Sequence, residues 1–202
     1  AERAEGGRDA GTTGETWRTL VELHLNRGDL PAWLAAGDAA ITELGTPAPA
    51  RFRAAAVLAM RAHARLAAGL TEAAADDIAQ ARGILAQMRI ARGSLVHGNV
   101  TVADARIRIA AGDATAALAL LAEQKAHWRE QDVGTASLRA EVHTIEVRAL
   151  LAIGRVAEAV ALARAADAEF APAPFRPYAV STDAELAVAH AQALLAAGDA
   201  AA

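Results

Sequence analysis

The sequence predicts an all-α protein, and three observations support that prediction. Hydrophobic residues make up 54% of the 202 positions but aromatic residues only 3%, so alanine and leucine supply the apolar content. Alanine is the strongest helix former, whereas strands favour β-branched and aromatic residues. Glycines able to end helices also recur at a regular spacing, with apolar residues at fixed distances on either side of them.

The period is marked by five glycines, which are separated by 41, 43, 42 and 44 residues: Gly28, Gly69, Gly112, Gly154 and Gly198. A fixed period of this length is typical of solenoids. Each glycine can end a helix in the left-handed conformation that a Cβ disfavours. We therefore expect each to form the elbow of an antiparallel helical hairpin. Together the hairpins predict a right-handed α-solenoid with a period of about 42 residues.

The elements follow from these elbows. Residues 1–14 are glycine-rich and are predicted to be a linker or frayed segment, with a capping-box pattern at Thr12 and Glu15. Residues 15–202 are predicted to form one repeat domain of about four and a half hairpins, within a fragment of a longer protein. Helices are expected at 15–27, 30–44, 51–68, 71–91, 95–111, 114–130, 135–153, 156–169 and 183–197.

Local signals refine the elbows. Asp29, Asp113, Asp199 and Thr71 are predicted to cap the helices that follow. Gly37 repeats the Gly-Asp pattern out of register, so we expect a tolerated surface glycine within a helix, at a cost of about 1 kcal/mol. The β-branched, glycine-containing stretch 94–102 predicts either a deformed helix or a binding loop.

Apolar residues occupy fixed rows around the elbows. Two rows on one helical face are expected to point inward. The row three residues before each glycine is Leu25, Leu66, Ile109, Leu151 and Leu195. The row seven residues before each glycine is Val21, Ala62, Ala105, Val147 and Ala191. Five residues after the glycines lie Trp33, Ala74, Ala117 and Ala159, a row expected to let the helices cross closely. Sixteen residues after them lie Leu44, Leu85, Trp128 and Phe170, which place a large side chain near each helix end.

A polar row lies six residues before each elbow: Glu22, His63, Arg106, Arg148 and Gln192. Two interpretations remain open. The row could be the solvated face of amphipathic helices, or it could line a concave groove that binds a partner. In a stack, His63, Arg106 and Arg148 would lie about 10 Å apart, a ladder suited to an acidic peptide or carboxylate ligand.

No pattern predicts catalysis, and we expect that the chain is not an enzyme and binds neither a cofactor nor a metal. The six histidines are scattered, and no phosphate-binding loop is present. The acidic clusters at Asp76–Asp77 and Asp183–Glu185 are interpreted as helix-start charges. A net charge of −4 and the absence of a long apolar stretch predict no direct contact with nucleic acid or membrane. The absence of cysteine is compatible with the cytoplasm, which we predict as the location.

The segments AAGDATAALALL (110–121) and AIGRVAEAVALA (152–163) resemble tetratricopeptide (TPR) repeats in the glycine and in the alanine five residues after it. The period is longer than the usual 34 residues, and the usual aromatics are missing. HEAT-like repeats share the period but not the internal proline and charge pattern. This alanine- and leucine-rich form looks like the sensor arms of large ATP-binding LuxR-type (STAND-class) bacterial transcription regulators. The resemblance covers roughly residues 15–200.

Two functions follow as hypotheses. The resemblance implies a protein-interaction or sensor module of a cytoplasmic signalling or transcription regulator, which binds a partner segment in the concave groove or self-associates as a homo-oligomer. The alternative is a small-molecule receptor, with an inducer inside the superhelix. An open polar groove would favour the first, and a closed, partly apolar cavity the second.

Overall fold

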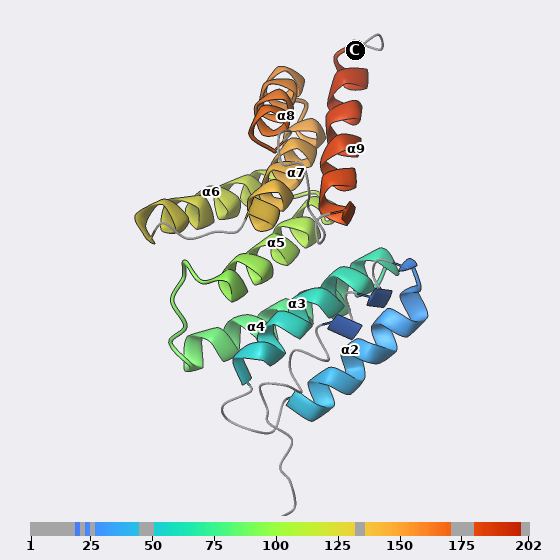
Figure 1. Cartoon of the computed structure of the whole chain (residues 1–202), viewed down its shortest axis with the longest axis vertical. Helices are drawn as coiled ribbons and strands as arrows, with labels where there is room; N and C mark the ends of the chain where they lie inside the picture. Colours follow the sequence, from blue (N-terminus) through green and yellow to red (C-terminus); the bar gives the residue numbers. More distant parts are fainter. Residues whose placement is uncertain are drawn as a thin grey trace, which may run out of the picture. The chain divides into compact units, whose positions relative to one another are not determined.

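The computed structural model describes residues 19–20, 23–24, 27–44, 51–131, 136–170 and 180–198, with the backbone alone at 51, 130–131, 136 and 180–184. Its regular structure is entirely α-helical, without strands in these ranges (Figure 1). The helices are α2 (Leu30–Leu44), α3 (Arg51–Ala67), α4 (Thr71–Gln87), α5 (Leu95–Ala110), α6 (Ala114–Gln131), α7 (Ala136–Ala152), α8 (Val156–Phe170) and α9 (Val180–Ala196). Six of them begin at the predicted residue. The predicted helix 15–27 and capping box at Thr12 and Glu15 lie largely outside the described residues.

The chain divides into two compact units, an N-terminal unit (residues 1–90) and a C-terminal unit (residues 91–202). Within the N-terminal unit, α3 packs against both α2 and α4. Within the C-terminal unit, α7 packs against α5, α6, α8 and α9, and the consecutive pairs α5–α6 and α8–α9 also pack (Figure 1). No described helix is long and apolar enough to cross a membrane.

The five elbow glycines all adopt the predicted left-handed conformation, with φ between +68° and +83°. At Gly112 the backbone N–H donates to the carbonyl of Ile109 at 3.0 Å, and Asp113 N–H donates to Arg108 at 2.8 Å, which closes the end of α5. The Asp113 carboxylate then accepts the N–H of Ala116 at 3.1 Å. Asp29 caps α2 in the same way, so both predicted caps are confirmed. Asp199 lies outside the described residues.

Two predictions about helix ends are wrong. Thr71 does not cap α4, because the N-cap position is Leu70, which makes no side-chain cap bond. The same helix ends at Gln87 rather than at residue 91. Arg89 there adopts a left-handed φ of +52°, and Ile90 N–H donates to the carbonyl of Leu85. A Schellman-type end therefore forms without glycine, which the sequence did not indicate.

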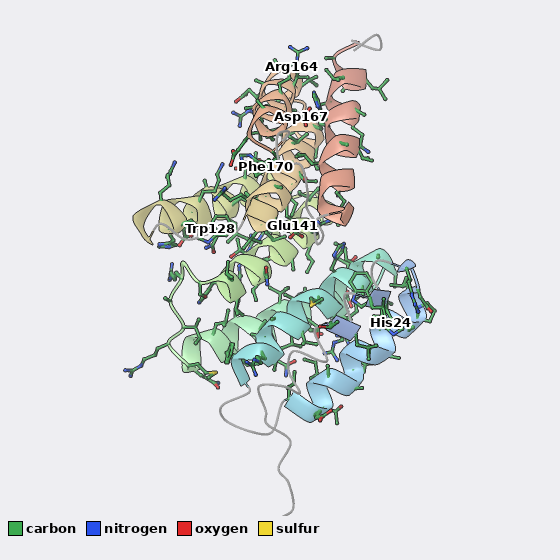
Figure 2. All side chains as sticks on the ribbon, in the orientation of Figure 1. His24, Trp128, Glu141, Arg164, Asp167 and Phe170 are labelled. Atoms are coloured by element: carbon green, nitrogen blue, oxygen red, sulfur yellow. The ribbon has the colours of Figure 1, made fainter. Side chains whose placement is uncertain are left out.

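The second helices of the hairpins follow the predicted rows. All residues five and sixteen positions after the elbows are buried, with at most 8% exposure. Trp128 and Phe170, labelled in Figure 2, lie near the ends of α6 and α8 as the pattern predicts. Alanine at the first row lets the helices cross closely, and the large side chain at the second fills the space where they diverge.

The first helices follow their predicted rows only in part. Ala62, Ala105 and Val147 are fully buried, and Leu66, Ile109 and Leu151 are half-buried. On α9 the prediction is wrong, because Ala191 is exposed and Leu195 is 65% exposed. A row twelve residues before the elbow, which the sequence analysis missed, is buried in all four hairpins: Val57, Val100, Val142 and Leu186.

Two glycines inside helices have packing roles that were not predicted. Gly37 lies within α2 as expected but is buried rather than on the surface, and an added Cβ would lie 3.2–3.3 Å from Arg61 carbons. Stretch 94–102 is neither deformed nor a loop, because Ser94 caps a regular α5. A Cβ on Gly98 would lie 2.6 Å from Leu138 and 2.8 Å from Trp128, so glycine is required for this packing.

Candidate functional site

The structure places the predicted polar row in different environments. Glu22 lies outside the described residues, and Gln192 is exposed on α9. His63 is half-buried on α3, where its ring meets Trp33 edge to face with centroids 5.3 Å apart. His63 belongs to the N-terminal unit and the last three residues of the row to the C-terminal unit, so each part is described by itself.

Arg106 is not the exposed groove residue that we predicted. Only 10% of its side chain is exposed. Its Nη2 donates to Glu141 of α7 at 3.0 Å and to Glu185 of α9 at 2.8 Å. Burial opposes the charge of Arg106, but the two carboxylates outweigh it and raise the pKa of the guanidinium above its ordinary value. Arg106 therefore ties α5 to two other helices.

Arg148 repeats the same relation one hairpin later. It lies 3.8 Å from Glu185, with 33% of its side chain exposed. Burial lowers the pKa of Arg148, Glu185 partly offsets that effect, and the charge of Arg106 adds to it. Glu141 and Glu185 each lie thirteen residues before their elbow glycines, two helical turns from the polar row. The repeated spacing of these two rows is visible in the sequence, but which residues pair depends on contacts between distant helices.

Two further polar side-chain contacts join a first helix to the preceding second helix. Lys125 of α6 pairs with Glu146 of α7, and Asp167 of α8 pairs with His190 of α9. In both pairs one residue lies thirteen positions after an elbow glycine and the other eight positions before the next. The C-terminal unit therefore uses the same two positions to join successive hairpins.

His143 lies on α7 and packs against the end of α8. Its Nδ1 lies 3.6 Å from Glu146, its Nε2 lies 3.7 Å from Glu169, and its ring is 5.9 Å from that of Phe170. Burial lowers the pKa of His143, and the nearby charge of Lys125 lowers it further, against the two glutamates. The neutral imidazole is therefore favoured in the folded chain.

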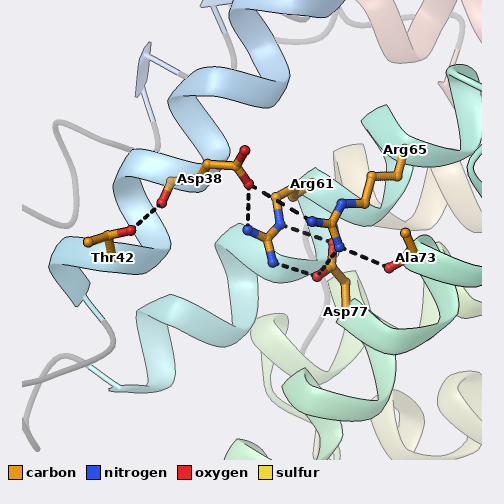
Figure 3. Close-up of polar contacts among 6 residues, drawn as sticks. All are labelled: Asp38, Thr42, Arg61, Arg65, Ala73 and Asp77. Carbon is orange, nitrogen blue, oxygen red and sulfur yellow. Dashed lines mark hydrogen bonds and ion pairs between the residues drawn. The ribbon is translucent and has the colours of Figure 1, made fainter.

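The N-terminal unit contains a buried charge cluster that joins α2, α3 and α4 (Figure 3). Asp77 is 2% exposed and accepts two hydrogen bonds from Arg61, at 2.6 and 3.1 Å, and one from Arg65 at 2.8 Å. Arg61 also donates to Asp38 at 2.7 Å. Interpreting Asp77 as a helix-start charge was wrong, because it lies well inside α4 and neutralises two arginines.

Burial would lower the pKa of Arg61, but the hydrogen bonds and charges of Asp77, and then of Asp38, raise it above its ordinary value. The guanidinium therefore stays charged and is held on both sides. Because every charge in this cluster has a partner, the cluster is a structural clamp that fixes α2 and α4 on α3.

A groove of about 330 Å³ lies beside this clamp. Ile41 of α2, Ala54 and Leu58 of α3, and Ile84 of α4 form its apolar wall. Gln80, Gly83 and Gln87 of α4 complete the lining, and all three are exposed. The two glutamines are seven residues apart, which places them about 10 Å apart along one face of the helix. Its lining carries no charged side chain.

Gly83 is the residue of this groove that the fold does not explain. It is a helical glycine without a positive φ, and a Cβ added to it would meet no atom within 4 Å. Glycine inside a helix costs about 1 kcal/mol relative to alanine. At Gly37 and Gly98 close neighbours account for the glycine, whereas Gly83 is exposed and an added Cβ would meet open space, so packing does not account for it. This signal could not be separated from an ordinary surface glycine in the sequence.

Groups of three or more histidine, aspartate or glutamate side chains placed to hold a metal ion are not found among the residues described. Comparison with known proteins identified no matching family model, no matching curated protein and no matching solved structure.

Proposed function

We propose that the chain is a TPR-like, right-handed solenoid of stacked hairpins that acts as a binding module. The repeated elbows support this arrangement, and so does the contact of α7 with both α5 and α9, which are the first helices of their hairpins. The polar side-chain pairs at matching positions give successive hairpins of the C-terminal unit a common register. In a solenoid each repeat contacts mainly its neighbours, which such pairs would fix.

The binding site that we propose is the groove between α2 and α4, rather than the polar row. Arg106, which the row would need as an anchor, is engaged inside the chain. The observation that carries the groove is Gly83, a helical glycine that lines it and has no neighbour that a Cβ would meet, although glycine is unfavourable inside a helix. The uncharged lining favours aliphatic side chains, and glutamine amides both donate and accept hydrogen bonds.

The occupant that fits this lining is an amphipathic partner helix that places one or two aliphatic side chains against Ile41 and Ile84, the half-buried aliphatic residues of the groove. A groove about two helical turns long accepts side chains at i and i+3 or i+4. On the resemblance in sequence, the module would belong to a cytoplasmic signalling or transcription regulator and would report the partner to its other domains. The alternative is a small-molecule receptor, which the volume of about 330 Å³ also favours, at the lower end of ligand pockets.

The test is a binding measurement with two probes. The first is a blocked alanine-glutamine helix that carries leucines at i, i+3 and i+7, and the second is N-acetyl-leucinamide, which presents one such side chain. We expect the helix to bind at least tenfold more tightly than the fragment, because it offers several anchors at once. Equal affinity would favour the small-molecule receptor.

Substitutions locate the binding. Gly83→Leu should fill the groove without strain and weaken the helix more than tenfold, while Ala75→Leu, on an exposed part of α4 outside the groove, should change affinity less than twofold. Circular dichroism checks that both variants keep their helix content. Undiminished binding to Gly83→Leu would contradict the proposed site.

A further inference from the structure

The buried charge cluster and the groove of the N-terminal unit lie on the same stripe of the helices that they share. On α3 the stripe runs from two groove residues to two arginines of the cluster, at spacings of three and four: Ala54, Leu58, Arg61 and Arg65. On α4 it runs from the buried aspartate into the groove at the same spacings: Asp77, Gln80, Ile84 and Gln87. Residues so spaced share one helical face, so the cluster lies one turn beyond the groove.

The cluster joins the two walls of the groove. α2 and α4 each pack on α3, but they do not pack extensively on each other. Arg61 connects them, because it donates to Asp38 of α2 at 2.7 Å and to Asp77 of α4 at 2.6 and 3.1 Å (Figure 3). On α2, Asp38 lies three residues before Ile41, which is again one turn from the groove. The bridge through Arg61 therefore helps to set the separation of the two walls.

The two ends of this bridge differ in burial. At the α4 end, Asp77 is 2% exposed and accepts hydrogen bonds from both Arg61 and Arg65. At the α2 end, Asp38 has 64% of its side chain exposed and lies 2.7 Å from Arg61 and 3.9 Å from Arg65. The stem of Arg61 also lies beside Gly37, where a Cβ would come within 3.2–3.3 Å of its carbons, so α2 has no room to move inward. The wall that can move outward is therefore α2, once its exposed contact is released.

We propose that Asp38 is a specificity-determining residue of the groove, because it holds α2 at a fixed separation from α4. With the contact formed, the groove keeps its volume of about 330 Å³ and selects leucine-sized side chains over the much larger indole. With the contact released, α2 moves outward and the groove admits both. Salt screens an exposed ion pair, so ionic strength regulates the selectivity of a groove whose own lining has no charge. This inference rests on the function proposed above.

The separation of the two walls is measured without a ligand. The sequence contains no cysteine, so spin labels on Ala39→Cys and Ala79→Cys report only the distance between α2 and α4. Both positions are exposed and lie outside the groove lining. In double electron–electron resonance, the distance distribution should lengthen and broaden when Asp38→Ala is added, and also in about 1 M NaCl without that change. The matched control is Asp76→Ala, which removes an exposed carboxylate of α4 outside the cluster and should leave the distribution unchanged.

Selectivity is measured with two blocked, uncharged alanine-glutamine helices, one with leucine and one with tryptophan at i, i+3 and i+7. The unaltered chain should bind the leucine helix at least tenfold more tightly. An exposed ion pair changes an equilibrium constant by no more than about fivefold, so Asp38→Ala should lower this ratio by about three- to fivefold. About 1 M NaCl should lower the ratio equally in the unaltered chain and in Asp76→Ala, but no further in Asp38→Ala.

The proposal is overturned if Asp38→Ala leaves the distance distribution unchanged, or if it leaves the ratio of the two affinities unchanged. It is also overturned if Asp76→Ala lowers that ratio as much as Asp38→Ala does. Failure of both helices to bind the unaltered chain would instead refute the function proposed above, and the spin-label distances alone would then decide whether Asp38 holds the two walls.

Discussion

Removing the carboxylate of Asp77 should be one of the most damaging single changes to the N-terminal unit. Asp77→Ala leaves Arg61, with 11% of its side chain exposed, without two of its three hydrogen bonds to carboxylates. It also removes the partner of Arg65 at 2.8 Å. Breaking a buried pair by deleting one partner costs about 3–5 kcal/mol. Because Arg61 keeps Asp38, we expect a value near the lower end, about 3 kcal/mol.

Native-state hydrogen exchange of the α3 amides is the appropriate assay, because it reports the opening free energy of this unit separately from that of the C-terminal unit. The matched control is Asp38→Ala, whose carboxylate is 64% exposed and should contribute no more than about 1 kcal/mol. The reasoning would be refuted if Asp77→Ala lowered the α3 opening free energy by less than about 1 kcal/mol. Equal losses in the two variants would refute it too.

Three further predictions follow from named positions. Gly83→Ala should stabilise the N-terminal unit by about 0.5–1 kcal/mol, because a Cβ there meets no other atom. Gly37→Ala should destabilise the unit despite the gain in helix propensity, because the added Cβ crowds Arg61, which both carboxylates hold in place. Urea denaturation measures the free energy of unfolding of both variants. Gly112→Ala should cost about 1–2 kcal/mol by the same method, because alanine is strained at φ +83°. Because the pKa of His143 is lowered in the folded chain, its neutral form does not reduce stability above the unfolded pKa of about 6.5. Below that pH the unfolded chain binds a proton that the folded chain disfavours, so the free energy of unfolding should fall. The fall in melting temperature from pH 7.5 to 5.5 should therefore be smaller in His143→Gln, and an unchanged or larger fall would contradict the prediction.

The sequence was sufficient for the helices and elbows because the signals for them are local. A left-handed turn depends on glycine itself, and a cap such as Asp113 depends on the next three residues. The rows of the second helices were predictable for a similar reason, because α4, α6 and α8 each pack on the helix just before them. The exposed Leu195 was not predictable from its row, since burial requires a partner helix and not only an apolar residue.

Long-range charge pairs account for the errors at Arg106 and Asp77. Arg106 looks like a surface residue in an amphipathic pattern, but its partner Glu185 is 79 residues away. Asp77 follows another aspartate near a helix start, so its position suggested a dipole charge rather than the partner of Arg61. The groove was also beyond prediction, because it is formed by side chains of three helices that are distant in the sequence.

The central claim, that the groove between α2 and α4 binds aliphatic side chains of a partner helix, is tested most directly by methyl NMR. With the leucine-bearing alanine-glutamine helix added, the methyl signals of Ile41 and Ile84 should shift together along one saturation curve. Those of Ile145, which is buried in the C-terminal unit, should stay within error of their free positions. The claim would be contradicted if the groove methyls did not move at saturation, or if shifts were confined to the C-terminal unit.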